Sequence, residues 1–119
     1  MRILLIDDNE STVKMLEKFL TIKGHHCTTS TTGRNALSLM TQEKFDIVIL
    51  GLTMPEFTGY DVIDNLEKNG NIQKQNIIIL TTSVITAEQE KSLLRRGVKA
   101  YLKKPVSPEV LLQTLEMTH

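Results

Sequence analysis

The sequence predicts an α/β fold in which helices cover both faces of a parallel sheet. The first observation is a run of four apolar residues, Ile47 to Leu50, without a polar break. Such a run is typical of a strand buried on both faces. The second observation is that such runs alternate with stretches of helical spacing in five strand–helix units, which favours parallel strands joined by right-handed crossovers. The 119 residues suit one domain, 1–119.

The five predicted strands are short and either apolar or rich in β-branched residues. The second of them, His26 to Ser30, contains little apolar character, and we interpret it as an edge strand. The strands are expected at Arg2 to Ile6, His26 to Ser30, Asp46 to Leu50, Asn76 to Leu80 and Ala100 to Leu102.

The helices are predicted from apolar residues at helical spacing and from their capping residues. Thr86 and Gln89 form a capping box, in which the N-cap hydroxyl and the N3 side chain satisfy each other's backbone amides. Ser107 followed by Pro108 is a strong start for the last helix. The expected apolar stripe of that helix consists of Val110, Leu111, Leu115 and Met117.

Composition excludes several classes of protein. The formal net charge is zero and the pI is about 6.8, so we expect no direct binding to nucleic acid. The single cysteine, Cys27, permits no intramolecular disulfide and fits a reducing compartment. No apolar run approaches the roughly 18 residues of a membrane span, and the apolar start is too short for a signal peptide. We therefore expect a cytoplasmic protein without a membrane partner.

Two other features receive a structural interpretation. His25 and His26 are adjacent at the start of a predicted strand, where neighbouring residues point to opposite faces, so they are not expected to share a metal ion. Cys27 is interpreted as a core or edge residue rather than a reactive thiol.

Polar residues follow four of the predicted strands. Because the carboxyl ends of parallel strands meet at one edge of a sheet, these residues are expected to converge. Paired carboxylates suit Mg²⁺, and a lysine beside a hydroxyl can steady a phosphoryl group. The residues are Asp7 and Asp8, Gly51 and Thr53, Thr81 and Thr82, and Lys104 and Pro105.

The whole chain resembles the receiver domain of two-component response regulators. The resemblance is carried by the four segments 5–9, 46–59, 78–82 and 100–105, whose mutual spacing agrees with the family throughout. It implies a doubly wound, flavodoxin-like (βα)5 domain with strand order 2-1-3-4-5. The motifs are Leu5-Ile6-Asp7-Asp8-Asn9, Leu52-Thr53-Met54-Pro55, Ile78-Ile79-Leu80-Thr81-Thr82 and Ala100-Tyr101-Leu102-Lys103-Lys104-Pro105.

The resemblance also implies a metal site. Asp7 and Asp8 would hold Mg²⁺, with the backbone carbonyl of Thr53 as a further ligand. In the family's pattern three carboxylates face one lysine, whereas here only Asp7 and Asp8 face Lys104. We therefore expect that Mg²⁺ binding is possible but weakened. One hypothesis is that Lys104 turns toward Asp8 and acts as its counter-ion.

The phosphoryl pocket implied by the resemblance consists of Thr81, Thr82 and Lys104. Thr81 and Tyr101 would form the switch pair, in which the position of the aromatic ring reports the state of the threonine. The Lys104–Pro105 peptide bond would be cis.

One position departs from the family pattern. The family's phospho-accepting aspartate aligns with Gly51, which has no nucleophile for aspartyl-phosphate chemistry. Asp46 does not replace it, because it lies at the other end of the strand, roughly 16 Å away at about 3.3 Å per residue. Glu56 lies in the following loop and would need a different backbone path.

We therefore predict a receiver module that cannot accept phosphate at position 51 and acts through protein–protein interaction. Its partner would be a sensor histidine kinase or another signalling protein, and it would be a monomer or a weak homodimer. By resemblance, the output face comprises the helix at Ala87 to Arg96, the strand at Ala100 to Leu102 and the last helix.

Two alternatives remain open. The first is an ordinary receiver that carries an Asp-to-Gly substitution at position 51, in which Gly51→Asp would restore labelling by a small phosphodonor. The second is a small phosphohydrolase or nucleotide-binding domain. Enzymatic activity is not expected, because the sequence has neither Gly-x-Gly-x-x-Gly nor a Gly-Lys-Ser/Thr phosphate loop.

Overall fold

Strands and helices alternate along the residues that this computed structural model describes, 1–82 and 84–118. The strands are β1 (Arg2–Ile6), β2 (His26–Ser30), β3 (Ile47–Leu50), β4 (Ile77–Thr81) and β5 (Ala100–Lys103). The helices are α1 (Glu10–Ile22), α2 (Gly33–Gln42), α3 (Gly59–Lys68), the 3₁₀ turn η1 (Ile72–Lys74), α4 (Ala87–Arg96) and α5 (Pro108–Thr118). Each predicted strand is present, with ends within one residue of the prediction.

The strands form one parallel sheet in the order β2-β1-β3-β4-β5, which confirms the predicted order. β1 therefore lies inside the sheet, where Ile3 is in register with Cys27 on one side and Ile47 on the other. The chain adds β2 on one side of β1 and then β3, β4 and β5 on the other side. The carboxyl ends of β1 and β3 are therefore neighbours at the point where the direction changes. A ligand pocket in such a sheet is expected beside this change of direction.

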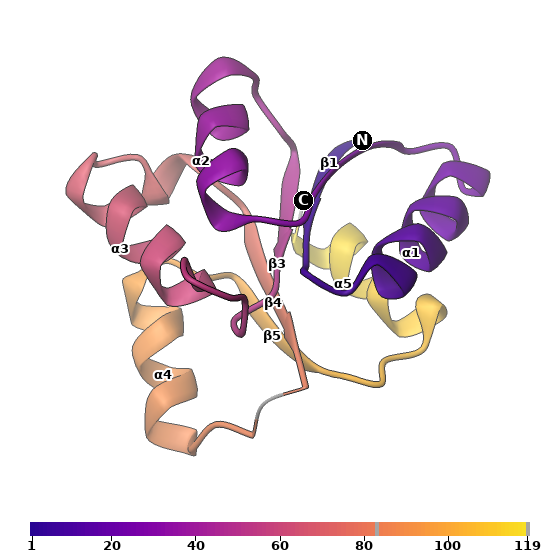
Figure 1. Cartoon of the computed structure of the whole chain (residues 1–119). Coiled ribbons are helices and arrows are strands. Elements are labelled where there is room, and N and C mark those ends of the chain that lie inside the picture. The colour runs from indigo at the N-terminus through magenta and orange to yellow at the C-terminus, as the bar shows by residue number, and fades with distance from the viewer. Residues whose placement is uncertain (83, 119) are drawn as a thin grey trace.

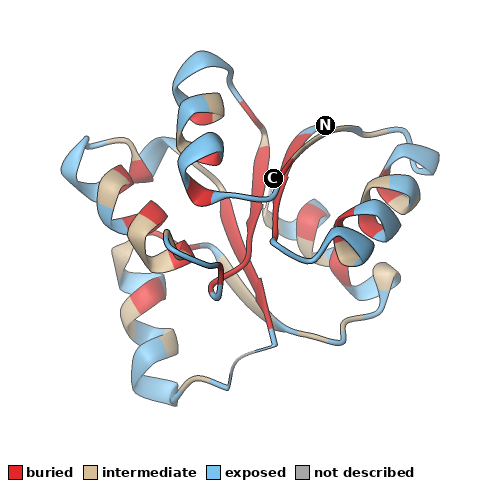
Figure 2. Cartoon of the chain, in the orientation of Figure 1, coloured by how far each residue is buried: buried red, intermediate tan, exposed pale blue. Residues whose placement is uncertain are grey.

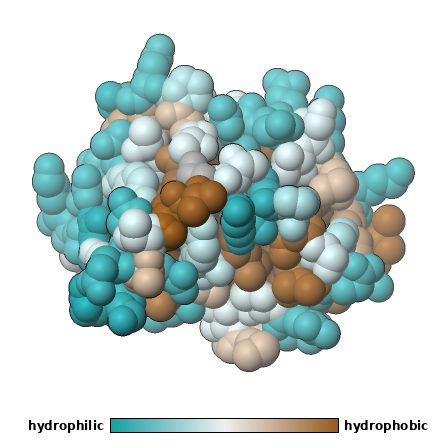
Figure 3. Space-filling model, turned by 90° about the horizontal axis from the view of Figure 1, so that it is seen from below, coloured by the Kyte–Doolittle hydropathy of each residue, from teal (hydrophilic) through white to brown (hydrophobic). Residues whose placement is uncertain are grey.

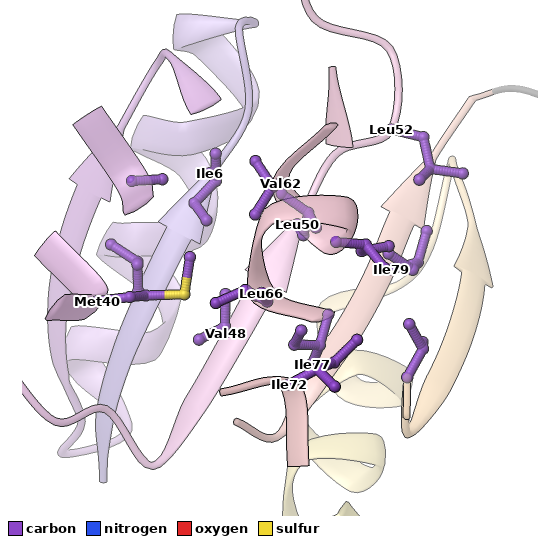
Figure 4. Close-up of a cluster of buried hydrophobic side chains, with 14 of the residues drawn as sticks. Ile6, Met40, Val48, Leu50, Leu52, Val62, Leu66, Ile72, Ile77 and Ile79 are labelled. Atoms are coloured by element: carbon purple, nitrogen blue, oxygen red, sulfur yellow. The ribbon is translucent and has the colours of Figure 1, made fainter. Parts of the chain in front are cut away.

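Helices cover both faces of the sheet, as Figure 1 shows with α1 and α5 on one side and α2, α3 and α4 on the other. Successive strand residues point to opposite faces. Ile3 and Leu5 accordingly pack beneath α1 and α5, whereas Leu4 and Ile6 pack beneath α2 and α3. Figure 4 shows the second cluster, where Val62 of α3 lies over the strands.

Burial follows this layered arrangement. The inner strands β1, β3 and β4 are buried in Figure 2, the edge strands β2 and β5 are mostly half-buried, and the outward faces of the helices are exposed. All four residues of β3 are buried, as the uninterrupted apolar run Ile47 to Leu50 predicted. None of the helices in the described part of the chain combines the length and the apolar character that a membrane crossing requires.

The apolar stripe predicted for α5 is half wrong. Leu111 and Leu115 are fully buried, but Val110 is 44% exposed and Met117 is 88% exposed. Leu111 and Leu115 are four residues apart and share one helix face, whereas each neighbouring position is turned away by about 100°. Two apolar residues of α5 therefore face outward.

The predicted helix starts are confirmed. Thr86 accepts a hydrogen bond from the backbone amide of Gln89 at 3.0 Å, and the Gln89 side chain accepts one from the Thr86 amide at 2.8 Å. The Ser107 hydroxyl oxygen accepts a hydrogen bond from the Val110 amide at 3.1 Å. These caps fix where α4 and α5 leave the edge of the sheet that carries the polar residues.

Candidate functional site

A cavity of about 100 Å³ lies at the carboxyl edge of the sheet, beyond β1, β3, β4 and β5. Figure 3 looks onto this side of the molecule, where hydrophilic residues separate the hydrophobic ones into distinct patches. The fold thus brings together the polar residues that the strand ends predicted. The cavity is lined by Asp7, Asp8, Asn9, Gly51, Leu52, Thr53, Leu80, Thr81, Thr82 and Lys104.

Lys104 and Asp7 form an ion pair across this cavity. The ammonium group of Lys104 donates to Oδ2 of Asp7, and the two side chains are only 16% and 13% exposed. Oδ1 of the same carboxylate accepts a hydrogen bond from the backbone amide of Asn9 at 2.9 Å. Asp8, by contrast, is exposed. The hypothesis that Lys104 turns toward Asp8 is therefore wrong, since its partner is Asp7.

The backbone positions both members of this pair. The Asp7 amide donates to the Ser30 carbonyl at 3.1 Å, which ties the end of β1 to the end of β2. The Lys104 amide donates to the Thr81 carbonyl at 2.7 Å, which ties the end of β5 to the end of β4. Asn9, which caps α1 through its side chain, was not predicted as a pocket residue. Its N-cap position directly after the acidic pair was the available signal.

Gly51 lies at the end of β3 and forms part of the cavity wall. Its amide donates to the Ile6 carbonyl at 2.8 Å, which continues the β1–β3 ladder by one residue. A β-carbon at this position would lie 3.3 Å from the Ile6 carbonyl oxygen and 3.5 Å from Oδ2 of Asp7. Its φ is not in the left-handed region. A side chain at position 51 would therefore begin beside the carboxylate of Asp7.

The hydroxyl residues at the end of β4 differ in exposure. Thr81 is only 2% exposed, whereas Thr82 is exposed at the rim of the cavity. Tyr101 of β5 is half-buried and packs against the hydrophobic cluster beneath α2 and α3. The peptide bond between Lys104 and Pro105 is cis. The switching role of Thr81 and Tyr101 stays a prediction.

The donor atoms of the cavity do not fit a tight Mg²⁺ site. Both oxygens of Asp7 are already engaged, and Gly51 contributes no side-chain oxygen. In the part of the chain that the structure describes, no three histidine, cysteine, aspartate or glutamate side chains are grouped to hold a metal ion. Mg²⁺ is held mainly by charged oxygen ligands, and of the two carboxylates that line the cavity only Asp8 is not paired with Lys104.

The single cysteine and the histidine pair lie away from this cavity. Burial raises the pKa of the Cys27 thiol to about 11, and the charge of Glu17 adds to this effect. Burial lowers the pKa of His25, whose Nδ1 lies 3.0 Å from the α-amino group of Met1. These residues are at the opposite end of the strands from Asp7, and they take no part in the site.

Comparisons with known proteins agree with this geometry. The response regulator SaeR of Staphylococcus aureus (strain USA300) is 32% identical over 111 residues, which cover 92% of this chain and 46% of SaeR. This chain thus spans about half the length of the curated relatives it matches.

Solved structures show the same fold. The chemotaxis protein CheY4 of Vibrio cholerae superposes with a TM-score of 0.88 at 29% identity, over 99% of this chain and 98% of that one. The signal receiver domain of a LuxO repressor protein from Vibrio parahaemolyticus has a TM-score of 0.90 at 24% identity, over 98% and 88% of the two chains. The second likeness supports the fold alone.

The family comparison covers almost all of the described chain. Residues 3–116 match the family "Response regulator receiver domain". The match includes β1 with its acidic pair and continues into α5, so it spans every element that builds the cavity. This chain belongs to the response regulator receiver domain family.

Proposed function

We propose that this receiver domain does not accept a phosphoryl group at position 51 and works by binding a signalling protein. The observation that carries the proposal is the lining of the cavity at Gly51. The acceptor of an aspartyl phosphate is a carboxylate oxygen, and the chain offers none at this position. The two carboxylates in the cavity are not equivalent substitutes, because Asp7 is paired with Lys104 and Asp8 is exposed.

The roles of the remaining pocket residues follow from the same proposal. Lys104, Thr81 and Thr82 are the groups that would contact a phosphoryl group, and Asp7, Asp8 and the Thr53 carbonyl are the groups that would face Mg²⁺, which receiver domains generally bind. Without an acceptor no phosphoryl ligand shifts the equilibrium between two conformations. Thr81 and Tyr101 then stay in one arrangement.

The output surface in this proposal comprises α4, β5 and α5. Three apolar side chains on its helices face solvent: Leu94 is 42% exposed, Val110 44% and Met117 88%. In this proposal these side chains supply the apolar part of the interface with a protein partner. We propose a sensor histidine kinase or another cytoplasmic signalling protein as this partner, with the chain itself a monomer or a weak homodimer. Sedimentation velocity at increasing protein concentration measures whether the chain is a monomer or a weak homodimer.

The test is labelling by a small phosphodonor. Purified protein is incubated with acetyl phosphate and Mg²⁺, and the intact mass is recorded for the original chain, Gly51→Asp and Gly51→Asn. The asparagine variant matches the aspartate in size and lacks its nucleophilic carboxylate. We expect no added phosphoryl group on the original chain or on Gly51→Asn.

The Gly51→Asp variant distinguishes an ordinary receiver pocket that lacks only its acceptor from a pocket that has lost phosphotransfer altogether. Labelling of that variant alone supports an intact receiver pocket that lacks only its acceptor. No labelling of any variant supports a pocket that has lost phosphotransfer altogether. A phosphoryl group on the original chain, located by peptide mapping, would overturn the proposal.

A further inference from the structure

We propose that Lys104 is the resident cation of this pocket and makes the domain insensitive to divalent metal. The inference deepens the proposed function, because it rests on the absence of a carboxylate at position 51. It goes beyond a weakened Mg²⁺ site. It assigns the neutralising role to a named side chain, and it specifies two single substitutions, each of which should create a site for a divalent metal ion.

The contact geometry assigns this role to Lys104. Its ammonium group reaches Oδ2 of Asp7 from the loop after β5, and the residues are 97 positions apart in sequence. Lys103, the preceding residue, is exposed and lines no part of the cavity. Of the described residues, Lys104 is the one cationic side chain in the cavity lining.

Both oxygens of the Asp7 carboxylate are satisfied without a metal. Oδ2 accepts from Lys104, and Oδ1 accepts from the Asn9 amide at 2.9 Å. A divalent ion would have to displace the ammonium group or compete with it at short range. Two positive groups on one carboxylate repel each other strongly in a site that is only 13% to 16% exposed.

Burial explains why Asp7 needs a positive partner. A buried charge that is neither paired nor hydrogen-bonded is costly, and removing one partner of a buried pair leaves the other uncompensated. With a carboxylate at position 51, the pocket would contain three acids and one lysine, and a divalent ion would be needed to balance them. With Gly51, two acids and one lysine leave a single negative charge, which sits on the exposed Asp8.

The consequence is a defined change in metal dependence. Removing the ammonium group returns the cavity to two uncompensated carboxylates, which is the charge that Mg²⁺ requires. Adding a carboxylate at position 51 does the same while Lys104 stays in place. Both changes should therefore create a divalent cation site in a domain that has none of useful affinity.

The experiment measures metal binding and stability, not phosphorylation. Mg²⁺ is titrated by calorimetry into the original chain, Lys104→Met, Gly51→Asp and the matched control Lys103→Met, and thermal unfolding is recorded in chelator and in Mg²⁺. Methionine keeps the length of the lysine stem and removes its charge. We expect no midpoint shift for the original chain or for Lys103→Met. For Lys104→Met we expect a lower midpoint in chelator, recovery in Mg²⁺, and binding about tenfold tighter or more.

Two results would overturn the inference. One is tight Mg²⁺ binding to the original chain that Lys104→Met leaves unchanged or weakens. The other is equal Mg²⁺ affinity for the original chain and Gly51→Asp, a comparison that remains available if Lys104→Met does not fold. Phosphodonor labelling of the original chain would contradict the proposed function instead, so the two failures have different readouts.

Discussion

The carbonyl oxygen of Gly51 occupies the space that a β-carbon on Gly59 would need. The Cα of Leu52 would lie 2.8 Å from the same β-carbon, and the Gly59 amide donates to the Leu52 carbonyl at 3.0 Å. The first turn of α3 is thus pressed directly onto the backbone at the end of β3. This close approach fixes the path of the loop that carries Thr53 into the cavity.

We predict that Gly59→Ala destabilises the domain by about 3 kcal/mol, because the obstructing atoms belong to the backbone and cannot rotate away. Gly51→Ala is the control, since its nearest contact is 3.3 Å, to the Ile6 carbonyl oxygen, and it should cost less than about 1 kcal/mol. Urea denaturation gives both values. Equal effects of the two substitutions would show that α3 can move away from β3.

Thr86→Ala should cost about 1 kcal/mol, because it removes the hydroxyl that accepts from the Gln89 amide at the start of α4. Thr86→Ser keeps that oxygen and is the matched control. Chemical denaturation of both variants separates the cap from loss of the methyl group. A cost for Thr86→Ser as large as that for Thr86→Ala would contradict the capping role.

Arg96 at the end of α4 joins this helix to Asp64 and Glu67 of α3. Its Nε donates to Glu67 at 2.9 Å, and this hydrogen bond raises the pKa of the guanidinium further above its ordinary value. We predict that Arg96→Met costs roughly 0.5–1 kcal/mol, because the acids are substantially exposed. Salt should screen the effect. A double-mutant cycle with Glu67→Gln measures it, and zero coupling at low salt would refute the interaction.

Cys27 should react slowly with alkylating reagents. Its pKa of about 11, against an ordinary value of 9.0, lowers the thiolate fraction near pH 8. A difference of this size corresponds to about a hundredfold lower rate than for an unshifted thiol. Iodoacetamide labelling followed by mass spectrometry measures the rate, and the same chain unfolded in urea is the control. Similar rates in the two states would contradict burial of the thiol.

The same shift predicts a dependence of stability on pH. The folded state retains the Cys27 proton above pH 9.0, whereas the unfolded state loses it. The contribution of the thiol to the free energy of unfolding is therefore complete below pH 9.0 and is lost as the pH rises to about 11. Cys27→Ala should remove this slope in denaturation experiments. A slope that persists in the alanine variant would have another origin.

The strand positions and the pocket lining could be predicted from the sequence because both depend on local signals. Apolar runs mark buried strands, and polar residues directly after them mark one edge of a parallel sheet. The choice of Asp7 over Asp8 as the partner of Lys104 could not be predicted. Asp7 and Asp8 are adjacent in the same loop and carry the same charge, and the path of the backbone alone decides which of the two side chains turns toward Lys104.

The error in α5 has a different physical cause. Val110 and Met117 are apolar, and hydrophobicity alone placed them in the core. Leu111 and Leu115 form the face of α5 that packs on the sheet, whereas Val110 and Met117 lie on other faces of the helix and are exposed. The helix face on which an apolar residue of α5 lies therefore decides whether its side chain is buried.

The space beside Asp7 has a genetic consequence. The φ of Gly51 lies outside the left-handed region, a β-carbon there would make a close contact of 3.3 Å with the Ile6 carbonyl oxygen, and two of the glycine codons become aspartate codons through one change at the second base. The backbone conformation at the end of β3 is therefore compatible with an aspartate at position 51. From either of those two codons a single point mutation would supply one, with a shift of a few tenths of an ångström between the new β-carbon and the Ile6 carbonyl.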